Sequence, residues 1–253
     1  MKKIFILLTL IPIMLIAQPY APNFQTGQPF NQPHRGGSND CGSPINPIVN
    51  CGFESGDFTG WITKDMAAPF VPIQVVNGGQ SIGYSFFTTA PTEGVFAALN
   101  GFDGGGPDTI EYAQDVTMPA TAESLTFDYR GAWDMSFGAT VDRTFEVQIQ
   151  PSGGGAALQT TSIFDTSPVG STVLDTGELT GSVNVTSFAG QSVRIAFIWN
   201  IPETNTGPGQ FQLDNVAIVG PPPMIPSLSF YALLLTIVLL MVIGNNHLKK
   251  KSS

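Results

Sequence analysis

Short runs in which apolar and polar residues alternate fill the middle of the chain. The clearest cover residues 125–129, 145–149 and 193–199, and one side of each run is apolar. A period of two is typical of β-strands that are buried on one face. Weaker runs with the same character cover residues 71–76, 95–99, 110–116, 182–185 and 211–219. Because glycine and proline separate the runs and no helical period is sustained, we expect an all-β, two-sheet sandwich of jelly-roll type with eight or nine short strands over residues 48–219.

Two continuous apolar stretches lie at the ends of the chain. Residues 1–17 begin with two lysines after Met1 and end on the small residue Ala17, which predicts a cleaved secretory signal peptide. An uncleaved anchor is the less favoured alternative, because the run is short for a bilayer and contains Pro12. Residues 228–244 have no polar face, and the segment 245–253 that follows carries three consecutive lysines. This pattern predicts a transmembrane helix with a basic cytoplasmic tail, which places the sandwich outside the cytoplasm.

Two connecting segments have a different composition. Residues 18–47 are rich in proline, glutamine, asparagine and glycine without apolar periodicity, and they predict a flexible leader. Residues 220–227 contain three consecutive prolines, which predict a stiff spacer between the sandwich and the membrane.

The exported part is strongly acidic. All nineteen acidic residues lie between the two apolar stretches. Five basic residues stand against them, and these are Arg35, Lys64, Arg130, Arg143 and Arg194. This balance makes nucleic acid a poor partner and is compatible with binding of divalent cations.

The cysteines and histidines restrict the chemistry further. Cys41 and Cys51 are the two cysteines, and in an exported chain they predict a disulfide. The two histidines, His34 and His247, lie outside the predicted sandwich, so a Ser-His-Asp hydrolase and a histidine-rich zinc site are excluded. Two facing carboxylates would suffice for a glycosidase, and that alternative stays open.

Three tryptophans are candidates for stacking on a sugar ring. Trp199 alternates in phase with other apolar residues of its strand, so we expect it in the core, and we expect Trp61 to pack as well. Trp133 lies between two predicted strands with Arg130 and Asp134 close by. A stacking ring and hydrogen-bonding groups would converge there, so these three residues are the predicted glycan contacts.

Two motifs at the ends of the sandwich carry a resemblance. "NCGFESGDFTGW" (residues 50–61) resembles the N-G-G-F-E start of galactose-binding-like jelly rolls, with Cys51 in place of glycine, and "FQLDNVAIV" (residues 211–219) resembles their last strand. The resemblance implies a jelly-roll fold of the kind found in carbohydrate-binding modules and bacterial surface proteins. It does not fix the ligand, because the same fold serves sugar binders, adhesins and domains with no known ligand.

The resemblance also implies a structural calcium ion between these motifs. Glu54 and Asp214 would approach each other where the first and last strands meet, and two carboxylates repel unless a cation lies between them. Backbone carbonyls of Gly52 and its neighbours would complete an oxygen shell, with Asp57 or Asn50 as weaker ligands. The alternative is a pair of hydrogen-bonded acidic residues that cap strand ends.

The C-terminal segment resembles a bacterial sorting signal of the IPTL type. Its box consists of Ile225, Pro226, Ser227, Leu228 and Ser229. Ser227 stands where the signal has threonine, and Tyr231 stands where it has tryptophan. The resemblance implies an exosortase-like processing enzyme in a Gram-negative bacterium, and an inner-membrane precursor whose periplasmic domain is later released to the cell surface or matrix.

The function that these observations favour is an exported, non-enzymatic carbohydrate-binding or adhesive module, with a glycan or surface polysaccharide as partner. A glycan hydrolase or lyase is the first alternative. A structural matrix component without a small ligand is the second.

Overall fold

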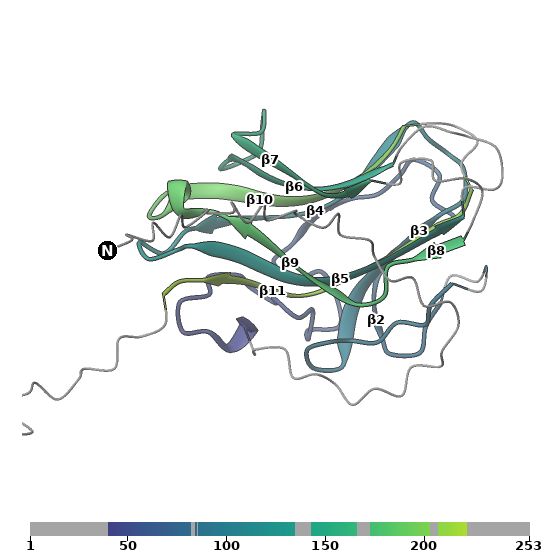
Figure 1. The fold of residues 1–253 in the computed structure, drawn as a ribbon, viewed down its shortest axis with the longest axis horizontal. Coiled ribbons are helices and arrows are strands. Elements are labelled where there is room, and N and C mark those ends of the chain that lie inside the picture. Colours follow the sequence, from purple (N-terminus) through teal and green to yellow (C-terminus); the bar gives the residue numbers. More distant parts are fainter. Residues whose placement is uncertain are drawn as a thin grey trace, which may run out of the picture.

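The computed structural model describes residues 40–81, 84, 86–134, 143–165, 173–202 and 207–221. Within these ranges the chain forms two antiparallel sheets that pack face to face (Figure 1). The elements in chain order are the 3₁₀ turn η1 (Asp40–Gly42), β1 (Ile62–Lys64), β2 (Val71–Asn77), β3 (Phe96–Phe102), β4 (Asp108–Thr117), β5 (Ser124–Asp134), β6 (Thr144–Pro151), β7 (Gln159–Asp165), β8 (Val173–Asp175), β9 (Leu179–Asn184), the 3₁₀ turn η2 (Thr186–Phe188), β10 (Ser192–Ile201) and β11 (Gly209–Val219).

The strand order explains how distant segments meet. One sheet has the order β1-β4-β10-β6-β7 and the other has the order β2-β3-β11-β5-β8, with β9 also paired to β5. The last strand, β11, therefore lies at the centre of its sheet, between β3 and β5. The all-β, two-sheet sandwich that the alternation predicted is confirmed.

The core follows the predicted alternation. On β10 the buried positions include Val193, Ile195, Phe197 and Trp199, and they pack against the inner face of the other sheet. Aromatic rings fill much of this space, since the Phe145 ring lies 4.4 Å, centroid to centroid, from the ring of Phe211 on β11. Burial of these large side chains is the main stabilising contribution to the sandwich.

Three strands were not expected from the pattern. β1 is three residues long, all of them exposed, and β8 is equally short. β7 reads "QTTSIFD" and lies at the edge of its sheet; its apolar residues Ile163 and Phe164, both packed against the core, are adjacent in sequence, so the strand shows no apolar alternation. Edge and short strands form because a neighbouring strand offers hydrogen bonds, and the local sequence carries little signal for that.

The end of the predicted leader lies against β11. The side-chain oxygen of Asn46 accepts hydrogen bonds from the backbone N–H groups of Ile48 (3.2 Å) and Ile218 (3.0 Å). Cys41 and Cys51 form the predicted disulfide, which ties η1 to the opening motif. Residues before 48, which the sequence assigned to the leader, thus pack against the sandwich.

Several predicted features lie outside the described residues. They are the signal peptide, most of the leader, the sorting box, the membrane helix over 228–244 and the basic tail. Among the helices in the described ranges, none has the length and apolar character needed to cross a membrane.

Candidate functional site

The opening motif forms a compact turn rather than a strand. The side-chain amide of Asn50 donates to the backbone carbonyls of Asp57 (2.9 Å) and Thr59 (3.2 Å), and its oxygen accepts from the N–H of Ser55 (3.0 Å). The Asp57 carboxylate accepts from the Ser55 hydroxyl (2.7 Å) and the Thr59 N–H (2.9 Å). The Thr59 side chain, then the Ser55 hydroxyl and the Thr59 backbone N–H, lower the pKa of Asp57 by hydrogen bonding to its carboxylate. Asn50 and Asp57 therefore hold the turn together, and the hydrogen bonds described for them are all within it.

Trp61 packs beneath this turn, as predicted. Its ring stacks on Phe53 with 5.2 Å between centroids, and its indole N–H donates to the backbone carbonyl of Asn50 (3.1 Å). The tryptophan at the end of the motif is thus part of the core, and its one polar atom is satisfied by the motif itself.

Asp214 lies on the outward face of β11, yet it has no exposed surface. Its Oδ2 accepts from the backbone N–H groups of Thr92 (2.6 Å) and Glu93 (3.0 Å) and from the Thr92 hydroxyl (3.2 Å). Its Oδ1 accepts from the N–H of Asn215 (2.7 Å). Burial raises the pKa of Asp214 to about 7, although these hydrogen bonds act in the opposite direction.

Glu54 binds the other end of the segment 92–96, whose first residues bind Asp214. Its Oε1 accepts from the backbone N–H groups of Val95 and Phe96, each at 2.9 Å. Glu54 and Asp214 thus bind the two ends of the segment 92–96, which leads into β3. The two residues are about 160 positions apart in sequence. The structure brings both predicted residues to one place through the backbone amides between them.

A third carboxylate lies there that sequence reasoning missed. A Cβ placed on Gly52 would lie 2.0 Å from Oε2 of Glu93 and 3.6 Å from Oδ1 of Asp214, so the Glu93 carboxylate covers Gly52. Burial, and then the charge of Glu54, raise the pKa of Glu93. Glu93 lies in a loop without a recognisable motif, and only its contact with Gly52 and Asp214 reveals its place.

The donor type of this acidic turn suits calcium, which prefers oxygen ligands. Within the described ranges, however, no three side chains of His, Cys, Asp or Glu gather closely enough to hold a metal ion. The hydrogen bonds to Glu54 and Asp214 are also those expected for acidic residues that cap a turn without an ion. The calcium site stays a prediction.

The predicted glycan contact Trp133 is wrong as an exposed stacking platform. The side chain is 5% exposed, belongs to the core, and stacks on Phe164 with 5.1 Å between centroids and 13° between ring planes. β5 continues through Trp133 to Asp134, so the residue alternates inward as Phe127 and Tyr129 do. What looked like a loop from the sequence is the end of a long strand.

The two polar residues beside Trp133 serve the sheet. Arg130 points to the outward face and makes a two-pronged contact with Asp175, at 2.9 Å from Nε and 2.7 Å from Nη2. Asp134 ends β5, and its backbone N–H donates to the carbonyl of Pro208 (2.9 Å). Trp133 points inward and Arg130 outward, so the predicted convergence on one ligand does not occur.

An exposed aromatic pair lies elsewhere on the surface. Phe70 is 50% exposed and Tyr84 is 42% exposed, and their ring centroids are 5.4 Å apart with the planes tilted by 54°. The Tyr84 hydroxyl donates to Oδ2 of Asp103, which raises the pKa of Tyr84. We name Phe70, Tyr84 and Asp103 the aromatic surface.

Three separate loops build the aromatic surface. Phe70 ends the β1–β2 connection, Tyr84 lies in the β2–β3 connection and Asp103 follows β3. Gly105 has a positive φ of 86°, and a Cβ there would lie 3.1 Å from the carbonyl oxygen of Ala68, so glycine allows two of the loops to touch. The glycines of "GFDGGG" (residues 101–106) are typical of a loop, but nothing in the sequence indicates that Phe70 and Tyr84 are its neighbours.

Comparisons with known proteins place the chain in no family. No protein-family model matches it, and no curated protein matches it significantly. Solved structures with a similar arrangement of the backbone are found.

Three of those structures illustrate the range. A family 61 carbohydrate-binding module solved with β-1,4-galactotriose is 15% identical, with a TM-score of 0.46, and the match covers 70% of this chain and 99% of that one. A cleaved adhesin domain of Lys-gingipain from Porphyromonas gingivalis is 16% identical, with a TM-score of 0.43 and coverage of 68% and 96%. The enzymatically active domain of a bacteriophage tailspike protein is 13% identical, with a TM-score of 0.40 and coverage of 68% and 21%. Similarities with TM-scores below 0.5 do not indicate a ligand for this chain. The side chains of the chain itself are the basis for inferring one.

Proposed function

We propose that this protein is a non-catalytic glycan-binding module whose ligand stacks on the aromatic surface. The observation that carries the proposal is the exposed ring pair of Phe70 and Tyr84 beside the Asp103 carboxylate. Exposed aromatic faces offer a platform for the apolar face of a pyranose ring, and an adjacent carboxylate accepts hydrogen bonds from sugar hydroxyls.

The charge of the chain favours neutral glycans as ligands. The chain carries a formal net charge of −9, and Asp103 adds an exposed carboxylate to the aromatic surface. An anionic sugar would meet this negative potential both on approach and on contact. A neutral oligosaccharide would meet no such repulsion.

The test is a glycan array probed with the full chain in a detergent that contains no sugar. The array carries neutral oligosaccharides, with β-1,4-galactotriose as one of the probes, and anionic ones; neutral probes should bind, and anionic ones should not. Phe70→Ala and Tyr84→Ala should each weaken binding by roughly tenfold, because a stacked ring contributes about 0.5–1.5 kcal/mol beyond the apolar area that it buries. Leu158→Ala, which removes an exposed apolar side chain elsewhere, is the matched control. Full binding by both ring variants would refute the proposal.

We also propose that the module is held at the inner membrane by its C-terminus and then sorted to the cell surface or matrix. The support is the sequence of residues 225–253, with its box, apolar stretch and lysines. A spacer with three consecutive prolines would keep the sandwich clear of the bilayer.

A structural calcium ion is the last part of the proposal. Glu54 and Asp214 would supply carboxylate oxygens, with the backbone near Gly52 beside them and the charge of Glu93 close by. The support is the negative charge gathered around Gly52, which a cation would compensate. When bound, the ion would stabilise the turn before β3.

A further inference from the structure

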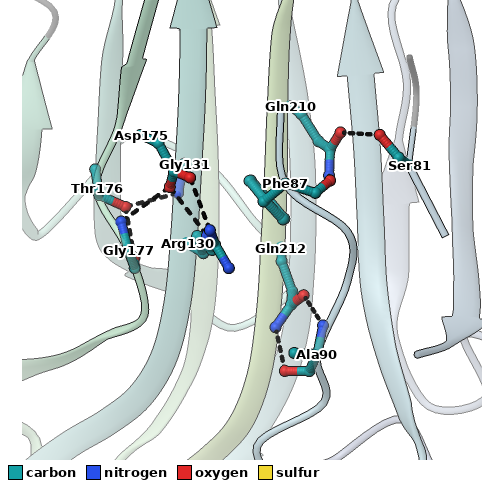
Figure 2. Close-up of polar contacts among 10 residues, drawn as sticks. All are labelled: Ser81, Phe87, Ala90, Arg130, Gly131, Asp175, Thr176, Gly177, Gln210 and Gln212. Atoms are coloured by element: carbon teal, nitrogen blue, oxygen red, sulfur yellow. Dashed lines mark hydrogen bonds and ion pairs between the residues drawn. The ribbon is translucent and has the colours of Figure 1, made fainter. Parts of the chain in front are cut away.

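Gln210 is a glutamine with no exposed surface, although it lies on the outward side of β11. The β2–β3 connection covers it there. Figure 2 shows its side chain reaching from β11 toward Ser81 and Phe87 of that connection. A buried amide requires partners, because an unmet donor or acceptor costs about 1–3 kcal/mol.

Both ends of the Gln210 amide bind this connection. Its Nε2 donates to the backbone carbonyl of Phe87 (2.9 Å), and its Oε1 accepts from the Ser81 hydroxyl (3.4 Å). Ser81 and Phe87 stand three residues before and three residues after Tyr84. One side chain of β11 thus ties the chain on both sides of the ring that the aromatic surface needs.

Phe87 is held by a second contact. The Arg130 guanidinium lies over its ring, 4.5 Å from the centroid, and Asp175 fixes that guanidinium. Two residues further along β11, Gln212 makes a matched pair of 3.0 Å hydrogen bonds with the backbone N–H and carbonyl of Ala90. From Phe87 onward the β2–β3 connection is therefore bound to β11 at Phe87 and Ala90. Before Tyr84, the hydrogen bond between Ser81 and Gln210 binds the connection to the same strand.

Tyr84 itself needs such support. Its φ is +53°, a left-handed conformation that is uncommon for a bulky residue and that persists where surrounding contacts hold it. Its hydroxyl contact with Asp103 and its ring contacts with Phe70 and Phe86 hold the outer end. The Gln210 amide holds the chain on the inner side.

We propose that Gln210 is a positioning residue for ligand binding, which holds the chain on both sides of Tyr84 so that its ring stays beside Phe70 and Asp103. The proposal rests on the proposed function. Loss of the amide lowers the fraction of molecules with Tyr84 in the binding position, and the apparent affinity falls by the same factor.

The experiment compares the full chain with Gln210→Met, which keeps the side-chain volume and removes both polar groups. Hydrogen exchange of peptides that contain Tyr84 should become about tenfold faster in the variant, since one buried hydrogen-bonding group is lost. Binding of the neutral array probes, β-1,4-galactotriose among them, should weaken by about the same factor. Gln148→Met, on the outward face of the other sheet, should change neither quantity.

The two readings separate failure of this proposal from failure of the proposed function. Unchanged exchange around Tyr84 in a folded Gln210→Met chain overturns the positioning role, whether or not any glycan binds. Faster exchange with unchanged affinity overturns it too. If Gln210→Met does not fold, Ser81→Ala removes the hydroxyl that donates to Gln210 and leaves the Gln210–Phe87 hydrogen bond in place. Faster exchange with weaker binding is expected from it, while no change in either quantity overturns the proposal.

Discussion

At the scale of single residues, burial decides what an aromatic side chain does. Trp133 has the composition around it that a sugar site would have, but its ring is enclosed by Phe164 and the core. Phe70 and Tyr84 have no such surroundings in sequence, and among the described residues they are the aromatic rings with the largest exposure. The alternation that correctly placed Trp199 in the core continues along β5 to Trp133, although Gly131 interrupts the apolar series there.

Replacing Trp133 by alanine should therefore cost stability rather than glycan contacts. Loss of a buried tryptophan leaves a cavity and costs about 3–5 kcal/mol, while Trp133→Phe should cost much less. Chemical denaturation of the two variants beside the unmodified chain measures this. A free energy of unfolding unchanged by Trp133→Ala would mean that the ring is not part of the core.

Asp214 predicts a pH dependence with a definite sign. Burial raises its pKa to about 7 in the folded state from its ordinary value of 3.8, so the folded state binds the proton more tightly than the unfolded state. In the presence of chelator, the free energy of unfolding that Asp214 contributes should fall as the pH rises from about 4 to 7. Above pH 7 it should stay constant. The full difference corresponds to roughly 4 kcal/mol.

The measurement is a set of denaturation curves at pH 5 and pH 7.5 in chelator, for the unmodified chain and for Asp214→Asn. The variant should lose most of the difference between the two pH values. Equal pH dependence in both proteins would show that Asp214 does not titrate in this window.

At the scale of elements, β11 combines two roles on its two faces. Phe211 and Leu213 point into the core, as the alternation predicted. Gln210, Gln212 and Asp214 alternate with them and would be assigned to solvent from the pattern, yet they are buried because the β2–β3 connection crosses over them. The polar residues along a strand indicate which side faces away from the core. Whether that side is exposed to solvent depends on whether another segment of the chain covers it.

The turn before β3 is the element on which calcium should act. If the ion binds, adding calcium at pH 7.5 should raise the melting temperature of the full chain relative to chelator, because a hundredfold excess over the dissociation constant adds roughly 2.7 kcal/mol to the free energy of unfolding. Asp214→Asn and Glu54→Gln should reduce this gain. Asp57→Asn should leave it intact, since Asp57 bonds within its own turn. Identical melting temperatures in calcium and in chelator would contradict the proposed calcium site.

At the scale of the whole molecule, the chain reads as an acidic sandwich followed by a proline-rich spacer, an apolar stretch and lysines. Removing residues 225–253 should move the protein from the membrane fraction to the soluble fraction of expressing cells, because the predicted helix supplies the attachment. A full chain as soluble as the truncated one, with no smaller processed form, would contradict the proposed anchoring.

The amino-acid sequence by itself determined the all-β class, most of the strands, the apolar side of each of the long ones and the disulfide, because these depend on local alternation and on a pair of cysteines. It also paired Glu54 with Asp214 through the motifs that carry them. Only the tertiary structure decided that both carboxylates meet at the amides of residues 92–96, that Glu93 joins them, and that Trp133 is core while Phe70, Tyr84 and Asp103 form a surface. Those relations join segments that are far apart in sequence, so they exist only once loops from different strands are packed against each other.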